Sequence, residues 1–295
     1  MATLSLARIE DYSNIKPTIE RIFNLAKYQL NLKIRRVAVK PNLCYYWEWS
    51  TGETTNPQLV SELIDFLRER LSRNLEISII ESDASAMKCK YAFKFLGYER
   101  LAKEKKVNLV NLTDDQSEYV KVKVNNQSYS LSVPTTIRKA DLFINLPKIK
   151  YMPQVIMSCA LKNIFGCNPR PNKFKYHGYL AETIVALNKV MKPDFCIVDG
   201  IIVLGQSTKR LGLLMASTDP VAIDAAAAKI LGLNASKIQY IRLAEKEGLG
   251  STKYETAGDH IDYFVQRFPR RSAINKLTSV ANVGLSTLRR ITRNV

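Results

Sequence analysis

Val37-Ala38-Val39-Lys40-Pro41-Asn42-Leu43 is the stretch that decides the fold, because a short apolar run stops there at a lysine, a proline and an asparagine. Nearly continuous apolar runs of this length are typical of strands buried in a parallel sheet. Six segments share the design, and each ends in polar residues or in glycine or proline: Ile34–Lys40, Glu76–Glu81, Val107–Leu112, Asp141–Leu146, Phe195–Asp199 and Leu211–Ala216. The sequence therefore predicts a mostly parallel sheet.

Apolar residues recur every three or four positions between several of these segments, as they do on one face of a helix. Four stretches show the pattern: Ile15–Leu30, Leu59–Leu71, Leu180–Met191 and Val221–Leu231. Asn56 and Pro57 form a typical helix start before the second stretch. Strands that alternate with helices predict an α/β fold with helices on both faces of the sheet.

The segment 119–133 breaks this alternation. Apolar residues stand at every second position on both sides of Asn125-Asn126, which predicts an antiparallel hairpin with a primed turn, inserted at the edge of the sheet. The chain then divides into an α/β body over 1–268, with its core over 35–250, and a basic tail over 269–295.

The charge of the chain favours polyanionic partners. The 295 residues carry a formal net charge of +17, and the tail 269–295 holds basic but no acidic residues. Its apolar residues from Ile274 to Ile291 form a narrow seam with helical spacing. The tail can be a membrane-surface helix, a partner helix, a nucleic-acid arm or a terminal helix packed on its own domain, and Gly284 weakens all helical versions.

Signals for membrane insertion, secretion and metal clusters are missing from the sequence. No apolar run reaches the roughly 18 residues that a membrane span needs, and Glu10 and Asp11 come too early for a signal peptide, so we expect a cytoplasmic protein. The cysteines are scattered and never spaced C-x-x-C: Cys44, Cys89, Cys159, Cys167 and Cys196. We expect reduced thiols and neither an iron–sulfur cluster nor a zinc site within this chain. The sequence identifies no cofactor.

Polar residues that follow the strands are the candidate site, because ligands of open α/β sheets bind outside the carboxyl ends of the strands. Lys40 and Lys148, at two strand ends, predict a site that binds or activates a carboxylate or a phosphate. We expect Asp199 as acid–base group or cation ligand, a role open also to Asp83, with His177 assisting. The expected ligand-binding residues are Asn42, Thr54, Thr55, Asp83, Asn145, Lys150, Lys162, Asn163 and Asp219.

Simpler structural interpretations exist for several of these residues. A single lysine at a strand end can simply extend into solvent. Capping of the following helix alone explains Asn56, and it explains Asp219 better than a role at the site does. The aromatic loop Tyr45–Trp49 can stack on a base, a ligand ring or a lipid headgroup, cover the pocket as a lid, or contact a partner.

The same residues resemble a known family. The motifs that carry the resemblance occur in this order: Val37–Leu43, Thr54–Pro57, Phe143–Lys150, Ala160–Gly166, Val198–Gly200 and Ala216–Asp224. They resemble the domain of unknown function 362 family over roughly residues 35 to 250. The resemblance implies an α/β fold with a site at these motifs. Because members are often joined to ferredoxin-like iron–sulfur modules, it also implies a redox context for some.

This chain departs from the family pattern at two places. The family often has histidine where Asn56 stands, and Thr-His-Gly where Tyr151-Met152-Pro153 stands. If those histidines act in relatives, the resemblance implies an altered or lost activity here. The Asp219-Pro220 segment also bears a distant likeness to lactate-racemase-type proteins.

Three functions are compatible with the sequence. The first is an enzyme, or a degenerate enzyme, that binds a small anionic substrate at the carboxyl edge of the sheet. The second is a redox accessory protein that docks a ferredoxin-like iron–sulfur partner. The third is a protein that binds nucleic acid or anionic lipid through its tail 269–295.

Overall fold

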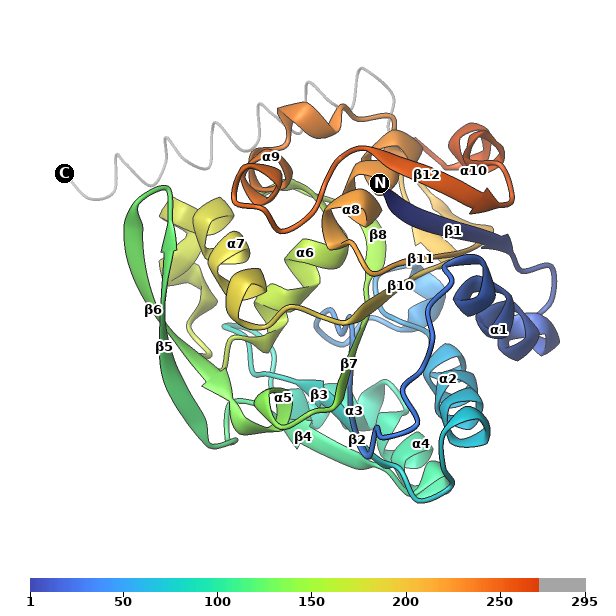
Figure 1. The fold of residues 1–295 in the computed structure, drawn as a ribbon, viewed down its shortest axis with the longest axis horizontal. Helices are drawn as coiled ribbons and strands as arrows, with labels where there is room; N and C mark the ends of the chain where they lie inside the picture. Colours follow the sequence, from blue (N-terminus) through green and yellow to red (C-terminus); the bar gives the residue numbers. More distant parts are fainter. Residues whose placement is uncertain (271–295) are drawn as a thin grey trace.

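The computed structural model describes residues 1–270, in which a large twisted sheet is covered by helices on both faces (Figure 1). The strands of this sheet are β1 (Ala2–Arg8), β2 (Arg36–Pro41), β3 (Glu76–Glu81), β4 (Asn108–Asn111), β7 (Leu142–Leu146), β8 (Lys148–Met152), β9 (Ile156–Ser158), β10 (Phe195–Leu204), β11 (Thr208–Ser217) and β12 (Tyr254–Gly258). Its main path runs β12-β1-β11-β10-β7-β2-β3-β4, with β8 and β9 paired beside β10.

The α/β class with a mostly parallel sheet is confirmed. β10, β7, β2, β3 and β4 are parallel neighbours, and each of the six expected segments forms a strand. β11 differs, because it follows β10 through a tight hairpin and pairs antiparallel with both β10 and β1. Its carboxyl end therefore lies at the opposite edge of the sheet from those of β2 and β3.

Two helical layers sandwich the sheet. The helices are α1 (Ile15–Leu25), α2 (Pro57–Arg70), α3 (Cys89–Phe95), α4 (Tyr98–Lys105), α5 (Thr135–Arg138), α6 (Ala160–Asn163), α7 (Leu180–Val190), α8 (Pro220–Leu231), α9 (Gln239–Lys246) and α10 (Ile261–Arg267). One buried cluster joins the sheet to α1–α4, and a second joins its other face to α6–α10. β2 contributes to both clusters, because Val37 and Val39 point into the first cluster and Ala38 points into the second.

The helix starts follow the sequence signals. Asn56 accepts a hydrogen bond from Gln58 N at the start of α2, and Pro57 occupies the first turn. The helix expected over Ile15–Leu30 is shorter and ends at Leu25.

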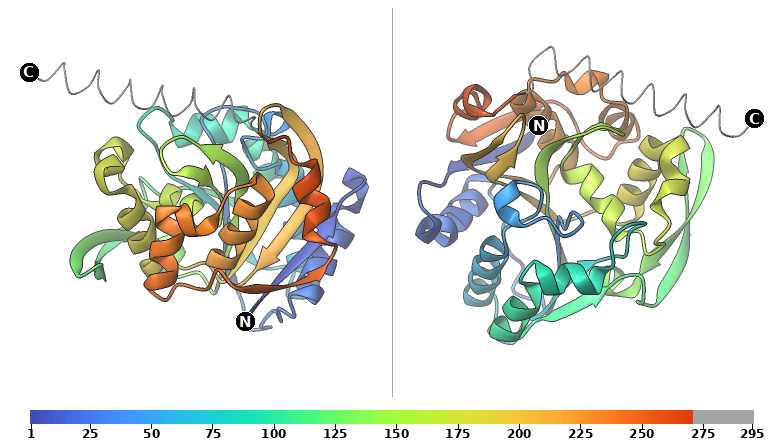
Figure 2. Two further views of the ribbon diagram at one scale, coloured as in Figure 1. Left: turned by 90° about the horizontal axis from the view of Figure 1, so that it is seen from above. Right: turned by 180° about the vertical axis from the view of Figure 1, so that it is seen from behind.

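The predicted hairpin is present as β5 (Ser117–Val124) and β6 (Gln127–Pro134). Asn125 and Asn126 have φ values of 47° and 64°, as a primed two-residue turn requires. The hairpin follows the edge strand β4 along the chain but does not extend the main sheet. It forms its own sheet and packs against α7 (Figures 1 and 2).

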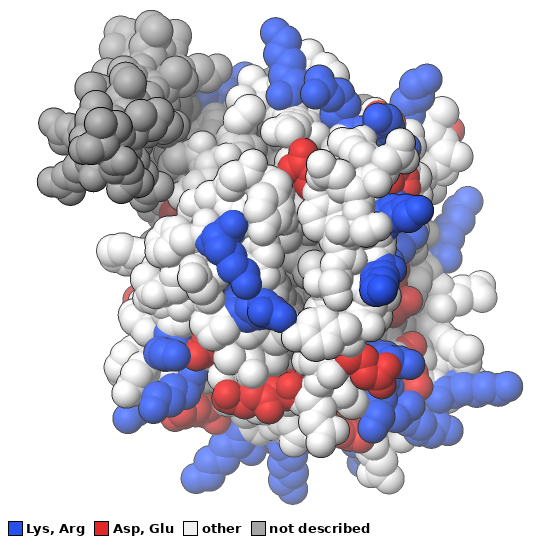
Figure 3. Space-filling model, turned by 90° about the vertical axis from the view of Figure 1, so that its left-hand side faces the viewer, with Lys and Arg blue, Asp and Glu red and all other residues white. Residues whose placement is uncertain are grey.

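The face that Figure 3 shows carries charges of both signs. Lys and Arg side chains lie around its margin and also near its middle, and Asp and Glu side chains lie among them, mainly in the lower half of the view (Figure 3). The expected basic tail 269–295 falls almost entirely on residues 271–295, which lie outside the described residues. Its proposed roles therefore stay predictions.

Candidate functional site

A pocket of about 410 Å³ opens at the carboxyl ends of β2 and β3, beside β8 and α6. The loop after β2, which contains the short 3-10 helix η2 (Trp49–Thr51), forms one wall, and the 3-10 segment η4 (Lys173–Tyr179) forms another. These segments face the viewer in the right panel of Figure 2. Six residues expected at the site line the pocket: Lys40, Asn42, Lys150, Lys162, Asn163 and His177.

Lys40 is neutralised by a carboxylate that the sequence analysis did not identify. Its Nζ lies 2.8 Å from Glu81 Oε2 and donates to Pro41 O at 2.6 Å, with both side chains almost completely buried. Gly166 makes room for this pair, because a Cβ there would lie 2.9 Å from Glu81 Oε1 and 3.0 Å from Lys40 Nζ. One signal was available, since Glu81 directly follows the apolar residues Ile79 and Ile80 at the end of its strand.

Lys150 has a similar arrangement with Glu53. Its Nζ lies 2.7 Å from Glu53 Oε2 and donates to Glu53 O at 2.8 Å. Cys44 also lines this side of the pocket. Burial raises the pKa of its thiol, against the charge of Lys150, which lowers it.

Lys162 and Lys173 are the pocket lysines without a carboxylate partner in the described part of the chain. Lys173 Nζ donates to Ser82 Oγ at 2.9 Å and to the carbonyl of Asn168. Lys162 Nζ lies 4.5 Å from the centre of the Phe165 ring. Burial is the main cause that lowers the pKa of each lysine to about 8; neighbouring lysine charges act in the same direction, and Glu81 opposes them. The pocket therefore holds four ammonium groups against two carboxylates.

Amide side chains connect the pocket to the core. Asn42 Nδ2 donates to Asn163 Oδ1 at 2.9 Å, and Asn163 Nδ2 donates to Asn145 Oδ1 at 2.7 Å. Thr55 Oγ1 accepts from Asn42 N and donates to the carbonyl of Leu146. Asn145, Thr54 and Thr55 are buried behind the pocket wall and shape it without lining it.

Lys148 and Asp199 form a buried ion pair behind the pocket. Their Nζ and Oδ1 atoms lie 3.2 Å apart, and Asp199 also accepts from the N–H groups of Asn56 and Ile201. Burial lowers the pKa of Lys148, while Asp199 opposes this shift. Neither residue lines the pocket. The ion pair and its hydrogen bonds hold β8, β10 and the start of α2 together.

Asp83 and Asp219 lie outside the pocket. Asp83 faces a neighbouring hollow and pairs with Lys88 at 2.8 Å. Burial acts to raise its pKa, but the hydrogen bonds from Lys88 and Cys89 N outweigh this and lower it. Asp219 follows the antiparallel strand β11 at the opposite edge of the sheet. There its carboxylate accepts from the N–H groups of Val221, Ala222 and Ser251, as a helix cap does.

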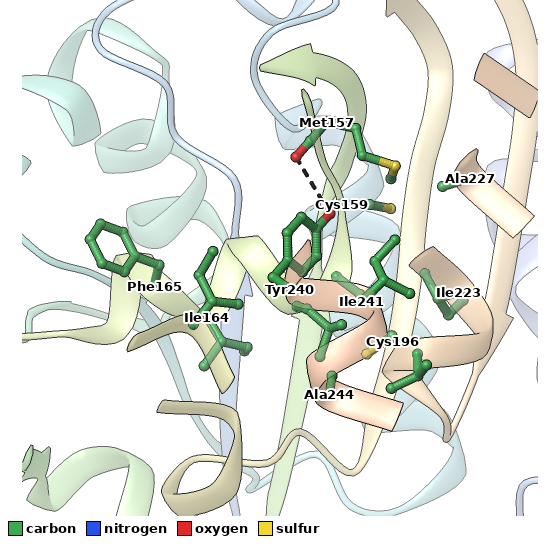
Figure 4. Packing of buried hydrophobic residues seen from close by; sticks show 14 of the residues in the cluster. Met157, Cys159, Ile164, Phe165, Cys196, Ile223, Ala227, Tyr240, Ile241 and Ala244 are labelled. Atoms are coloured by element: carbon green, nitrogen blue, oxygen red, sulfur yellow. Dashed lines mark hydrogen bonds between the residues drawn. The ribbon is translucent and has the colours of Figure 1, made fainter. Parts of the chain in front are cut away.

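Asp224 supports the helix that carries Lys162. It is fully buried and accepts hydrogen bonds from Ala160 N at 2.6 Å and Leu161 N at 3.3 Å, at the start of α6. Burial raises its pKa to about 7, opposed by these hydrogen bonds and one from Tyr240. Figure 4 shows Tyr240 among the apolar side chains of this region, with its hydroxyl directed at Met157 O. The sequence analysis did not place Asp224 in the site.

Two kinds of feature are absent from the described residues. They contain no group of three or more His, Cys, Asp or Glu side chains that could hold a metal ion. They also contain no helix long and apolar enough to cross a membrane.

Comparisons with known proteins give a family and two distant likenesses. The model of the family described as "Domain of unknown function (DUF362)" matches residues 37–229. The "Thylakoid-associated protein sll1697" of Synechocystis sp. (strain ATCC 27184 / PCC 6803 / Kazusa) is 34% identical over 129 residues, covering 39% of this chain and 40% of that protein. The match thus spans less than half the length of that curated relative.

Among solved structures, the lactate racemase apoprotein from Thermoanaerobacterium thermosaccharolyticum is similar with a TM-score of 0.46. The sequences are 11% identical, and the match covers 80% of this chain and 58% of that chain. At this level of similarity no residue role is transferred from it.

Proposed function

The chain belongs to the DUF362 family, and we propose that it binds a small anionic molecule, a carboxylate or a phosphate, at the carboxyl edge of its sheet. The observation that carries the proposal is the excess of positive charge in the pocket. Lys40 and Lys150 are neutralised by Glu81 and Glu53, whereas Lys162 and Lys173 have no carboxylate partner in the described residues. An uncompensated ammonium group in a partly buried pocket is costly, and an anion bound between the two lysines removes that cost.

The pocket residues then take different roles. Lys173 is fixed by Ser82 and Asn168 and serves as the anchor for the anion. Lys162 has no hydrogen bond to another described side chain and a pKa of about 8, so it is the residue suited to act as base or nucleophile. His177, which also lines the pocket, is positioned to assist in proton transfer. The site can thus belong to an enzyme or to a binding protein that has lost its activity.

Calorimetric titration with inorganic phosphate and with succinate tests the proposal. Lys162→Met and Lys173→Met should each weaken binding by about ten- to a hundredfold, since a hydrogen bond to a charged group contributes about 1.5–3 kcal/mol. Lys175→Met is the matched control, because Lys175 is exposed two positions from Lys173 and does not line the pocket. Binding of neither probe, or equal losses in all three variants, contradicts the proposal.

The pH dependence is a second readout of the same experiment. Lys162 and Lys173 bind anions as ammonium groups, and both have pKa values of about 8 in the free pocket. Affinity should therefore be highest below pH 8 and fall as the pH rises through this value. A carboxylate probe that stays fully ionised from pH 6 to 10 isolates the lysine titration.

A further inference from the structure

Exposed aromatic side chains surround the mouth of the pocket. Trp47 and Tyr45 line it from the loop after β2, and Phe174 lines it from η4. Trp47 is 58% exposed and Phe174 is 55% exposed, although both are large and apolar. We call the following group the aromatic rim: Tyr45, Tyr46, Trp47, Tyr91, Phe95 and Phe174.

The rim extends from the loop onto α3 without a break. Tyr46 and Phe95 are in edge-to-face contact at 5.7 Å between ring centres, and Phe95 stacks on Tyr91 at 6.0 Å. The hydroxyl of Tyr46 accepts from Lys88 N at 3.0 Å, which fixes the loop to the start of α3. Phe95 is nevertheless 60% exposed. Tyr46, Phe95 and Tyr91 thus form an apolar patch next to the loop that lines the pocket.

Lysines alternate with the aromatics on both sides of the mouth. Residues 88–95 contain three lysines, and residues 173–177 contain two, with no acidic residue in either segment. Lys173 N donates to Ser85 Oγ at 2.9 Å, which joins the second segment to the loop that precedes the first. Lys88 is paired with Asp83, whereas Lys90, Lys94 and Lys175 have no carboxylate partner among the described residues. The acidic residues near the rim are Asp83, Asp114 and Glu48, and the pocket behind the rim holds two unneutralised lysines.

We propose that the aromatic rim docks on an anionic membrane surface, so that the phosphate of a lipid headgroup enters the lysine pocket; this rests on the anion binding proposed above. Tyr and Trp favour the headgroup level of a bilayer because they combine an apolar ring with a polar group. Lysines beside them are attracted to anionic lipids. The rim supplies both, around a pocket that accepts the same charge as the headgroup.

The ring geometry favours a membrane over single-stranded nucleic acid. Nucleic-acid binding of that kind needs ring faces that are free to stack on successive bases. Here Tyr91 and Phe95 stack on each other, and Tyr46 packs edge-on against Phe95, so these rings form a compact apolar patch. An oligonucleotide is therefore a competing outcome of the test.

The two tryptophans of the chain make the test specific. Trp49 packs against Tyr12, whereas Trp47 is exposed on the rim, so Trp49→Phe leaves Trp47 as the sole reporter. This full-length variant is titrated with phosphatidylglycerol–phosphatidylcholine vesicles, with pure phosphatidylcholine vesicles and with a single-stranded DNA oligonucleotide. We expect a blue shift of Trp47 emission and quenching by brominated lipid with the anionic vesicles, and at least a tenfold weaker response with the neutral ones.

Two sets of variants complete the design, measured by vesicle co-sedimentation. Phe95→Ser with Trp47→Ser should reduce binding at least tenfold in a chain that retains Trp49. Leu32→Ser should have no effect, because Leu32 is 70% exposed on a loop that does not line the pocket. Lys162→Met should weaken competition by a soluble short-chain phosphatidylglycerol.

Each failure has a distinct meaning. Phosphate binding without any vesicle response leaves the proposed function standing and overturns the docking surface. Vesicle binding with unchanged Trp47 emission, or binding that persists in the rim variant, places the contact elsewhere and also overturns it. A Trp47 response to the oligonucleotide alone replaces the membrane with nucleic acid. Loss of phosphate binding as well would be a failure of the pocket itself.

Discussion

Asp224, which is buried at the start of α6, links the stability of the fold to pH. Its pKa is about 7 in the folded protein because burial disfavours the carboxylate, compared with 3.8 for an exposed aspartate. The folded state therefore retains the proton over this range while the unfolded state releases it. The contribution of Asp224 is largest below pH 4 and is lost as the pH rises toward 7.

Asp224→Asn should remove this dependence. Three pKa units correspond to about 4 kcal/mol, so the unfolding free energy of the parent should fall relative to that of the variant between pH 4 and pH 7. Urea unfolding of both proteins at several pH values measures the difference between their unfolding free energies. The contributions of the other titrating groups are the same in both proteins and cancel in this difference. Parallel pH profiles for the two proteins would show that the Asp224 carboxylate ionises freely in the folded state.

Single residues at the site were only partly predictable. The rule that ligands bind at strand ends found Lys40, Lys150 and Lys162, because each follows or flanks a strand or its motif. It did not find the partners of these lysines. Glu81 meets Lys40 because β3 lies next to β2, and the order of strands in a sheet is not written in a local pattern.

At the scale of elements, the β8–β9 turn holds Lys150 at the pocket and contains a strained residue. Ile156 has a φ of +74°, in the left-handed region that β-branched residues rarely adopt. Its side chain is half exposed, so it recovers little of the strain by packing. Such conformations cost about 1–3 kcal/mol, and they recur near binding sites.

Ile156→Asn should stabilise the protein by about 1 kcal/mol, because asparagine tolerates the left-handed region. Thermal or urea unfolding checks this, with Ile238→Val, a buried and unstrained site, as a control that should lower stability. A loss of stability in Ile156→Asn would mean that the exposed isoleucine makes a packing contribution larger than its strain. If vesicle binding falls while stability rises, Ile156 belongs to the docking surface.

Elements with a strong apolar run or a clear alternation were predictable, and elements with neither signal were not. The six expected strands all form, whereas β12 was missed because its residues are mostly exposed and not apolar. The direction of β11 was also missed. The chain reverses within the three residues between Leu204 and Thr208, and a local apolar pattern does not encode direction. That reversal is why Asp219 lies at the other edge of the sheet.

At the scale of the whole molecule, net charge gave the least specific information. The value of +17 indicates attraction to polyanions but does not show which part of the molecule would bind them. The described structure shows two unneutralised lysines inside a pocket and further lysines around its rim, while charges of both signs lie on the face that Figure 3 shows. The basic residues of 271–295 lie outside the described part, so the tail stays a second prediction of where polyanions bind, beside the proposed pocket.

Deletion of residues 271–295 separates these two sources. All residues that line the pocket fall between Lys40 and Leu180, and a chain that ends at Arg270 keeps the hydrogen bond from Gln206 N to Pro269 O. If the described pocket and rim bind the anion by themselves, phosphate affinity should change less than twofold on deletion, and the Trp47 response to anionic vesicles should persist.

A loss of binding on deletion of residues 271–295 would assign that binding to the tail. If the shortened chain loses vesicle or nucleic-acid binding while phosphate still binds, the tail carries the attraction to polyanions and the aromatic rim does not. Titration in low and in physiological salt distinguishes the mechanisms further. Binding through dispersed basic residues weakens steeply with salt, whereas anchoring by buried lysines and aromatic rings weakens much less.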